Sequence, residues 1–227
     1  TRLNRRTTFM KKIIYFLLCI LLFTSMFATS VFAYSPQKAI TYSNTYAINP
    51  NKMNTLGVGY NVYSRDCTNF VSQCLYAGGL SQDSTWKSIP NWHGNTVVRV
   101  DSTQWVNANS LKEYLKTSGR GTKIGSWSLK GSPSPYLTFA YVNDSSNLSS
   151  SRTGKVVLFY DWESDGTMNH SAFFVANNGK STLSGEGYGD LINQHTENRK
   201  QVLWRPDNRQ NSTQKATIRV YAFEIKA

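Results

Sequence analysis

The sequence predicts an α+β protein in which amino-terminal helices pack on an antiparallel β-sheet. Apolar residues recur at helical spacing as far as residue 115, and short apolar and β-branched runs replace them from residue 155 onward. Helices followed by strands, rather than alternating with them, are typical of the α+β class. Aromatic residues make up 13% of the chain, which is enough to fill one sizeable core.

The first 33 residues have the order of features found in an export signal. Five basic residues precede an unbroken apolar run over residues 13–23, and a small-residue exit ends at Ala33. The run is far shorter than the ~20 residues of a membrane-spanning helix. We expect residues 1–33 to be an amino-terminal extension and signal peptide, within which Met10 resembles the natural start; a retained anchor is the alternative. Residues 34–227 are then a single secreted domain, extracellular or associated with the cell wall.

The secreted part is expected to be basic. Without the five basic residues of the first 33, the formal net charge falls from +12 to +7. This charge favours loose association with the anionic envelope of a bacterial cell, although it serves solubility equally well. Because no Lys/Arg cluster is interleaved with aromatic residues, we expect no nucleic-acid partner. We expect the domain to be a monomer.

Three helices are expected in the first half of the domain. The first begins at Pro36, after a serine cap, and ends before Pro50. The second follows Asp66, which we interpret as its cap, and stops at Gly78. The third carries helically spaced apolar residues over 105–119.

Loops and strands account for the remaining residues. Segment 51–65 is polar and contains glycine, 80–104 shows no clear period, and 119–151 is rich in Ser, Gly and Pro. All three are predicted to be loops, and the last two are long enough to serve as functional flaps. Short apolar or alternating runs predict strands. These runs cover residues 156–162, 171–176, 191–196, 202–204 and 217–225.

Cys67 and Cys74 are the cysteines that remain beyond the signal segment. On the second helix they belong to one apolar stripe with Phe70, Val71 and Leu75. Two helical turns separate their Cα atoms by about 10 Å, beyond the ~7 Å limit for a disulfide. A thiol at a helix amino terminus is activated, because free N–H groups and the helix dipole stabilise its thiolate. Cys67 is therefore a candidate nucleophile, whereas Cys74 is expected to be a small buried side chain.

The segment from Asp66 to Gly79 resembles the putative bacterial amidase domain family. It is more distantly similar to papain-like cell-wall cysteine amidases and peptidases of the CHAP type. The resemblance implies a papain-like cysteine hydrolase fold, in which the nucleophile opens a helix and a histidine opens the strand that faces it. Further matches occur in family order around residues 39–47, 105–115, 154–162, 169–172 and 194–196.

His170 is the candidate base, because it stands at the head of an apolar strand and its side chain can take the thiol proton. A catalytic imidazole needs a partner that fixes its orientation. Asn193 and His195 share one face of the following strand, so either is a candidate, and Gln194 is expected to point away. Asn193 is preferred, since the spacing resembles the Glu-x-Asn pair of CHAP enzymes. Asp190 is more typical of a strand end.

Several side chains are candidates for substrate binding. Asp66 lies beside the nucleophile and can influence substrate entry besides capping the helix. Aromatic residues of the long loops can line a flap over the cleft, although a small satellite core explains them equally well. The predicted substrate-binding residues are Asp66, Tyr63, Trp92 and Trp105, with Trp86 and His93 as further flap residues.

The predicted function is a secreted cysteine amidase or peptidase that forms an acyl-enzyme at Cys67. By analogy, its substrates are peptides of the cell wall or peptidoglycan-derived fragments, and no cofactor or metal is expected. An inactive relative that binds wall peptides is the alternative. A zinc hydrolase using Cys67, His170 and His195 is a third hypothesis, weakened by the absence of a close ligand pair such as Cys-x-x-Cys.

Overall fold

The structure is a computed structural model and describes residues 33–130, 134–137, 150–205 and 217–226. Residues Tyr34–Ala227 form one compact unit. In the described part of the chain, no helix is both long enough and apolar enough to cross a membrane.

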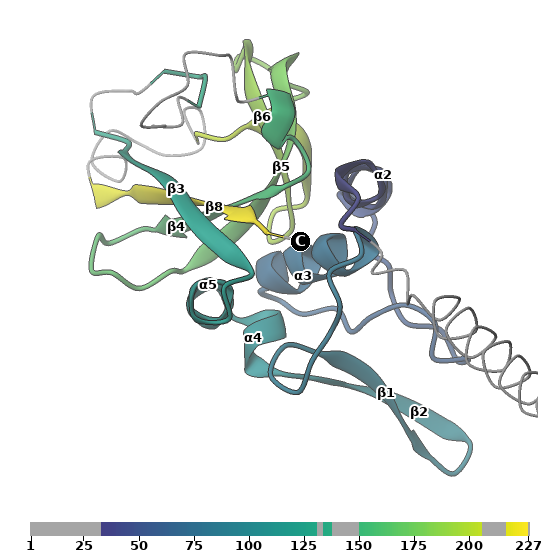
Figure 1. Ribbon diagram of the computed structural model, residues 1–227. Coiled ribbons are helices and arrows are strands. Elements are labelled where there is room, and N and C mark those ends of the chain that lie inside the picture. The colour runs from purple at the N-terminus through teal and green to yellow at the C-terminus, as the bar shows by residue number, and fades with distance from the viewer. Residues whose placement is uncertain (1–32, 131–133, 138–149, 206–216, 227) are drawn as a thin grey trace, which may run out of the picture. The chain divides into compact units, whose positions relative to one another are not determined.

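The described residues contain a six-stranded antiparallel sheet in the order β3-β8-β4-β5-β6-β7 (Figure 1). Neighbouring strands β4, β5 and β6 are consecutive along the chain, whereas β8 returns to pair between β3 and β4. The α+β class predicted from the sequence is therefore confirmed. The strands are β3 Gly121–Ser128, β4 Val156–Asp161, β5 His170–Lys180, β6 Tyr188–Gln194, β7 Arg199–Leu203 and β8 Arg219–Ile225.

The predicted helices are present, with one break. The predicted third helix is interrupted at Asn107, whose side chain accepts a hydrogen bond from the N–H of Ser110 and so starts a new helix. The four α-helices of the described residues are α2 Pro36–Tyr46, α3 Cys67–Ala77, α4 Thr103–Val106 and α5 Ala108–Thr117, and a 3-10 turn, η1, spans Ser150–Arg152.

Both faces of the sheet are apolar. Along β4, Val157 and Phe159 belong to the core that includes the helices, whereas Val156 and Leu158 belong to a second core on the opposite face. Alternate residues of a strand point to opposite faces, so a strand buried on both sides has a continuous apolar sequence. This explains why β4 is readable as a strand from its composition.

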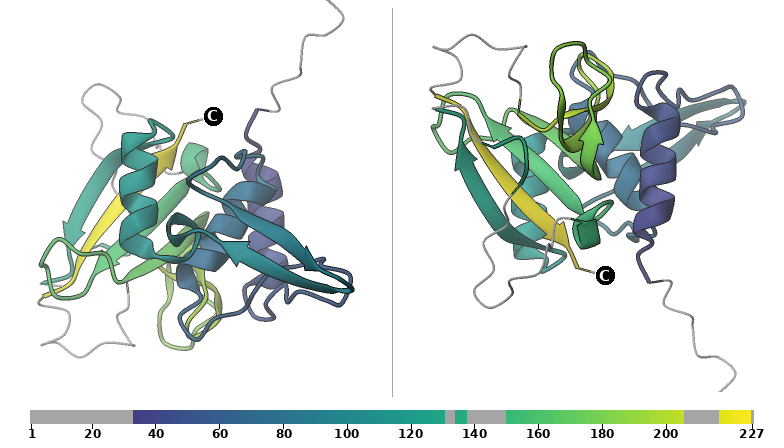
Figure 2. Two further views of the ribbon diagram at one scale, coloured as in Figure 1. Left: turned by 90° about the horizontal axis from the view of Figure 1, so that it is seen from below. Right: turned by 90° about the horizontal axis from the view of Figure 1, so that it is seen from above.

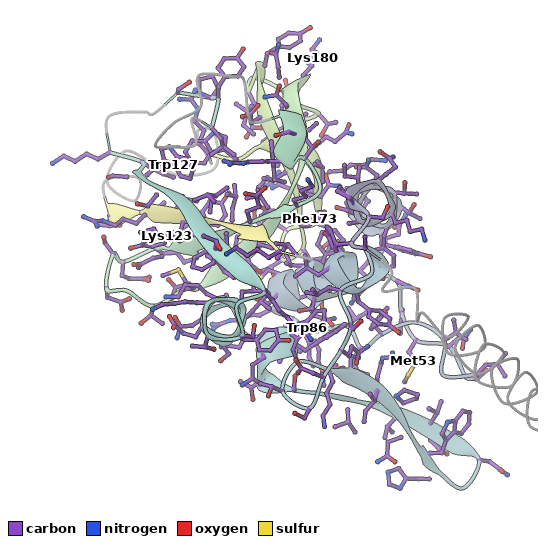
Figure 3. All side chains as sticks on the ribbon, in the orientation of Figure 1. Met53, Trp86, Lys123, Trp127, Phe173 and Lys180 are labelled. Atoms are coloured by element: carbon purple, nitrogen blue, oxygen red, sulfur yellow. The ribbon has the colours of Figure 1, made fainter. Side chains whose placement is uncertain are left out.

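Helix α3 lies between the sheet and a cluster of aromatic side chains. Trp86 donates a hydrogen bond to Ser72 of α3, with Nε1 and Oγ 3.0 Å apart, and Trp105 donates one to Asn69 at 2.8 Å. The two indole rings lie 4.7 Å apart. Figure 3 shows Phe173 and Trp86 on opposite sides of this helix. Nine of the eleven residues of α3 are buried, so its first residue is held firmly in place.

Two predicted loops contain strands. Residues 80–104 include β1 Ser88–His93 and β2 Thr96–Asp101, which pair as an antiparallel hairpin. The hairpin extends away from the large sheet (Figures 1 and 2), and most of its side chains are exposed. It therefore lacks the apolar alternation that marks a half-buried strand. Strand β3 lies in the polar segment 119–151, which was also predicted to be a loop. Residues 131–133 and 138–149 of this segment lie outside the described residues.

Replacement of Trp105 by alanine is expected to lower the free energy of unfolding by about 3–5 kcal/mol. The change creates a large cavity and leaves the Oδ1 atom of Asn69 without its donor. Trp92 is the matched control, because it is 57% exposed and its replacement by alanine is expected to cost no more than about 0.5 kcal/mol. Urea denaturation followed by circular dichroism measures both values. Equal losses in the two variants would contradict the placement of Trp105 in the core.

Candidate active site

The candidate nucleophile opens helix α3. Cys67 is the first helical residue and is 6% exposed. Asp66 occupies the cap position, as predicted, but its side chain makes no capping hydrogen bond. Among the described residues, none accepts a hydrogen bond from the backbone N–H groups of Cys67, Thr68 or Asn69. The amino terminus of α3 therefore presents free donors beside the thiol.

The candidate base opens strand β5. His170 pairs across the sheet with Tyr160 of β4, and both rings lie close together. The indole of Trp162 stacks on the imidazole, with ring centroids 5.7 Å apart and planes inclined by 24°. Nε2 of His170 lies 3.3 Å from Oε1 of Gln194. When Nε2 carries the proton and donates it to this amide oxygen, Nδ1 is free to accept the proton of the thiol.

The surroundings of Cys67 favour its thiolate. Burial of the sulfur opposes ionisation, but the charge of His170 and its hydrogen bond to the sulfur act in the opposite direction. The backbone N–H of Ser171 and the hydroxyl of Thr68 donate further hydrogen bonds, and together these groups lower the pKa of the Cys67 thiol from 9.0 to about 6. The hydroxyl of Thr68 also meets that of Ser171 at 3.1 Å, which ties the first turn of α3 to β5.

The pairing of β5 with β6 decides which residue orients His170. Asn193 is paired with Phe173, whose side chain lies on the helix-facing side of the sheet. Directly opposed residues of antiparallel strands point to the same face, so Asn193 and, by alternation, His195 lie on that side. Gln194 shares the opposite face with His170. The structure therefore places neither Asn193 nor His195 beside His170, and the expectation that Gln194 points away is wrong.

Asn193 and His195 have other partners. The amide of Asn193 donates hydrogen bonds to Ser43 and Asn44 at the end of α2. The imidazole of His195 is fully buried, and its Nδ1 lies 2.6 Å from Oδ2 of Asp66. Both residues therefore connect β6 to the helices rather than contacting the base.

The predicted substrate-binding residues do not line the pocket at Cys67. Asp66 is 4% exposed and turned inward, and Trp105 is buried in the aromatic cluster. Tyr63 donates its hydroxyl proton to Asp101 at 2.6 Å. Trp92 lies on the exposed β1–β2 hairpin. The predicted flap therefore consists of core residues and hairpin residues, and Trp105 packs in the core that includes the helices rather than in a separate satellite core.

A pocket of about 460 Å³ opens over the nucleophile and the base. Its wall combines aromatic surface from β4 and the residues after it with charged groups from three different loops. Trp162 and Glu163 could have been predicted from the sequence as residues of the pocket wall, because they directly follow a strand that ends next to the candidate histidine. The lining residues besides Cys67, His170 and Gln194 are Arg65, Tyr160, Trp162, Glu163, Asn169, Thr196 and Glu197.

The turn between β6 and β7 forms part of this pocket. Thr196 and Glu197 both have positive φ values, 58° and 62°, as the two central residues of a type I′ hairpin turn require. A β-branched residue in this conformation is strained. The hydroxyl of Thr196 accepts the backbone N–H of Asp66 at 2.9 Å. This bond joins the turn to the residue before the nucleophile.

The second cysteine takes no part in the site. Cys67 and Cys74 are both free and buried, as the helical separation predicts. Burial raises the pKa of the Cys74 thiol far above its ordinary value. Within the described residues, no group of three His, Cys, Asp or Glu side chains is arranged to hold a metal ion. His195 is bound to Asp66 rather than grouped with Cys67 and His170.

Comparison with known proteins identifies the family. Two Bacillus subtilis (strain 168) proteins, both described as uncharacterized, are similar to this chain. YjcM is 37% identical over 93 residues, which are 40% of this chain and 18% of YjcM. YhbB is 28% identical over 180 residues, which are 76% of this chain and 45% of YhbB. The chain thus matches less than half the length of either relative.

No solved structure matches this chain. A family model described as "Putative amidase domain" matches residues 33–221, which include every element from α2 to the first part of β8. The chain therefore belongs to the Putative amidase domain family, whose description indicates hydrolysis of amide bonds.

Proposed function

We propose that the protein is a cysteine-dependent amidase or peptidase with a papain-like active site. One observation carries the proposal: the thiol at the open amino terminus of a buried helix shares one pocket with an imidazole that lowers its pKa, and an amide oxygen lies 3.3 Å from Nε2 of that imidazole. Activation of a nucleophile requires such a chain of three groups. The three side chains belong to Cys67, His170 and Gln194, and all of them line one pocket.

The reaction proceeds by acyl transfer. The Cys67 thiolate attacks the amide carbonyl carbon, and the backbone N–H groups at the start of α3 receive the negative charge that develops on the oxygen. The protonated His170 gives its proton to the leaving nitrogen, the C–N bond breaks, and an acyl-thioester remains on the sulfur. Water, deprotonated by His170, then attacks the thioester and releases the acid, and the thiolate is restored.

The pocket supports a peptide substrate with charged groups. Arg65 lines one part of the wall, and Glu163 and Glu197 line others. Among the described residues, no ion pair involves Arg65 or Glu163, whereas Glu197 pairs with Arg199. Cell-wall peptides carry both amino and carboxyl groups, which these side chains can bind. With residues 1–33 as an export segment, we propose that the enzyme acts outside the cell on peptidoglycan-derived peptides.

Replacement of Cys67 by alanine is expected to abolish product release from purified wall fragments, because the acyl-enzyme has no other attachment point. His170→Ala is expected to lower the rate by roughly 10²–10⁴-fold. Mass spectrometry of new amino and carboxyl ends identifies the cleaved bond, and the Cys74→Ala variant is the matched thiol control. Activity is expected to persist in a metal chelator. Identical products from the Cys67→Ala protein and the unmodified protein would refute the proposal, and binding without any cleavage would favour the inactive binding module.

Gln194→Ala is expected to lower kcat by roughly tenfold or more, with a smaller effect on KM, because the imidazole loses its orienting partner. Asn198 provides the control, since it is an exposed amide of the adjacent turn that binds the backbone of Ile48. Its replacement by alanine is expected to leave kcat unchanged. Steady-state kinetics on the identified wall peptide measure both effects. An unchanged kcat in Gln194→Ala would show that this amide does not orient the base.

A further inference from the structure

Asp66 and His195 form a buried pair directly behind the nucleophile. Asp66 precedes Cys67 in the chain and is 4% exposed, and His195 is fully buried. Oδ2 of the carboxylate lies 2.6 Å from Nδ1 of the ring. The ring stacks on Phe70 of α3 with centroids 4.0 Å apart. The reaction described above uses neither residue, yet burying two ionisable groups is costly unless they pair.

Hydrogen bonding defines the charge of this pair. Nε2 of His195 lies 2.8 Å from the carbonyl oxygen of Tyr46, and because a carbonyl oxygen can only accept, Nε2 must carry a proton. Oδ1 of Asp66 already accepts the N–H of Tyr63 at 3.1 Å and the amide of Asn69 at 2.8 Å. These donors favour negative charge on the carboxylate. One proton shared between Oδ2 and Nδ1 then makes the pair neutral as a whole.

The pair also explains why α3 has an open amino terminus. An aspartate in the cap position normally accepts hydrogen bonds from the N–H groups of the second or third helical residue. Asp66 instead has φ −100° and ψ 3°, and its carboxylate binds His195, Tyr63 and Asn69. The carboxylate is thus held in the interior, and Asp66 does not line the pocket.

We propose that His195 is a positioning residue, which holds the Asp66 carboxylate away from the first N–H groups of α3 and cancels its charge. These N–H groups then remain available to the Cys67 thiolate and to the developing oxyanion. The inference rests on the proposed function, since it assigns a role in the same site. Without His195, an unpaired carboxylate next to the nucleophile would disfavour the thiolate by repulsion and would be free to cap the helix.

The other titratable groups around Cys67 are not substituted in this test. His170 faces the sulfur from β5, and Tyr160 lines the pocket from β4. Arg65, Glu163 and Glu197 line the pocket from the loops. A change in the ionisation of Cys67 on substitution of Asp66 or His195 therefore reports on the pair itself.

The test is the pH dependence of iodoacetamide alkylation at Cys67, read by peptide mass spectrometry on the full chain. In the unmodified protein, the rate is expected to reach half of its maximum near the thiol pKa of about 6. His195→Gln is expected to move this midpoint to higher pH by roughly one unit or more. Asp66→Asn is expected to leave the midpoint unchanged or to lower it. The double variant is expected to return close to the unmodified value, because both charges are gone.

A charge effect raises the midpoint in His195→Gln but not in Asp66→Asn, which distinguishes it from loss of packing. A folded His195→Gln protein with an unchanged midpoint overturns the inference, as does a shift to higher pH in Asp66→Asn. If His195→Gln does not fold, as judged by circular dichroism, Asp66→Asn and the double variant decide the question by the same criteria. A midpoint near 9 in the unmodified protein would instead contradict the proposed function, before any variant is considered.

Discussion

The structure depends on one constraint, which is that the amino terminus of α3 is open although an acidic residue precedes it. Asp66 makes no capping hydrogen bond, and the N–H groups of the first helical residues have no acceptor among the described residues. Free N–H groups at the end of a helix stabilise negative charge. Cys67 is the residue beside these groups. Burial raises the pKa of its thiol, but His170, the backbone N–H of Ser171 and the hydroxyl of Thr68 together lower it to about 6.

The fold holds this helix end rigidly. Helix α3 is buried between the sheet and the aromatic cluster, so its first residue cannot shift without disturbing the core. Because β5 and β6 are antiparallel, the first residue of β5 and the last residue of β6 meet at the same end of the sheet. His170 and Gln194 occupy these two positions. Strand ends therefore supply the imidazole and its amide partner, and the adjoining loops supply the pocket wall.

The sequence predicted those parts of the site that local signals define. Cys67 follows an acidic residue and begins a stretch of helically spaced apolar residues that ends at a glycine. His170 stands at the head of an apolar strand. Gln194 could not be assigned in this way, because the face on which it lies depends on the pairing of β6 with β5. A shift of one residue in this register reverses the face of every side chain. The exposed β1–β2 hairpin was missed because its strands bury almost no apolar surface.

The pairing of Asp66 with His195 was also beyond reach of the local pattern. The two residues are 129 positions apart, and a single aspartate before a helix is typical of a cap. Only the fold shows that a histidine of the β6–β7 hairpin binds that carboxylate. The proposed active site thus combines a nucleophile that the sequence reveals with supporting groups that depend on tertiary structure.

The most direct measurement of the central claim is the ultraviolet absorbance of the thiolate as the pH is lowered, compared between the protein and its Cys67→Ser variant. If the open helix end and His170 stabilise the thiolate, the difference between the two proteins persists through neutral pH and declines with a midpoint near 6. If the difference is already lost on acidification through pH 9, the ordinary value for a cysteine, Cys67 is not an activated nucleophile and the account is contradicted.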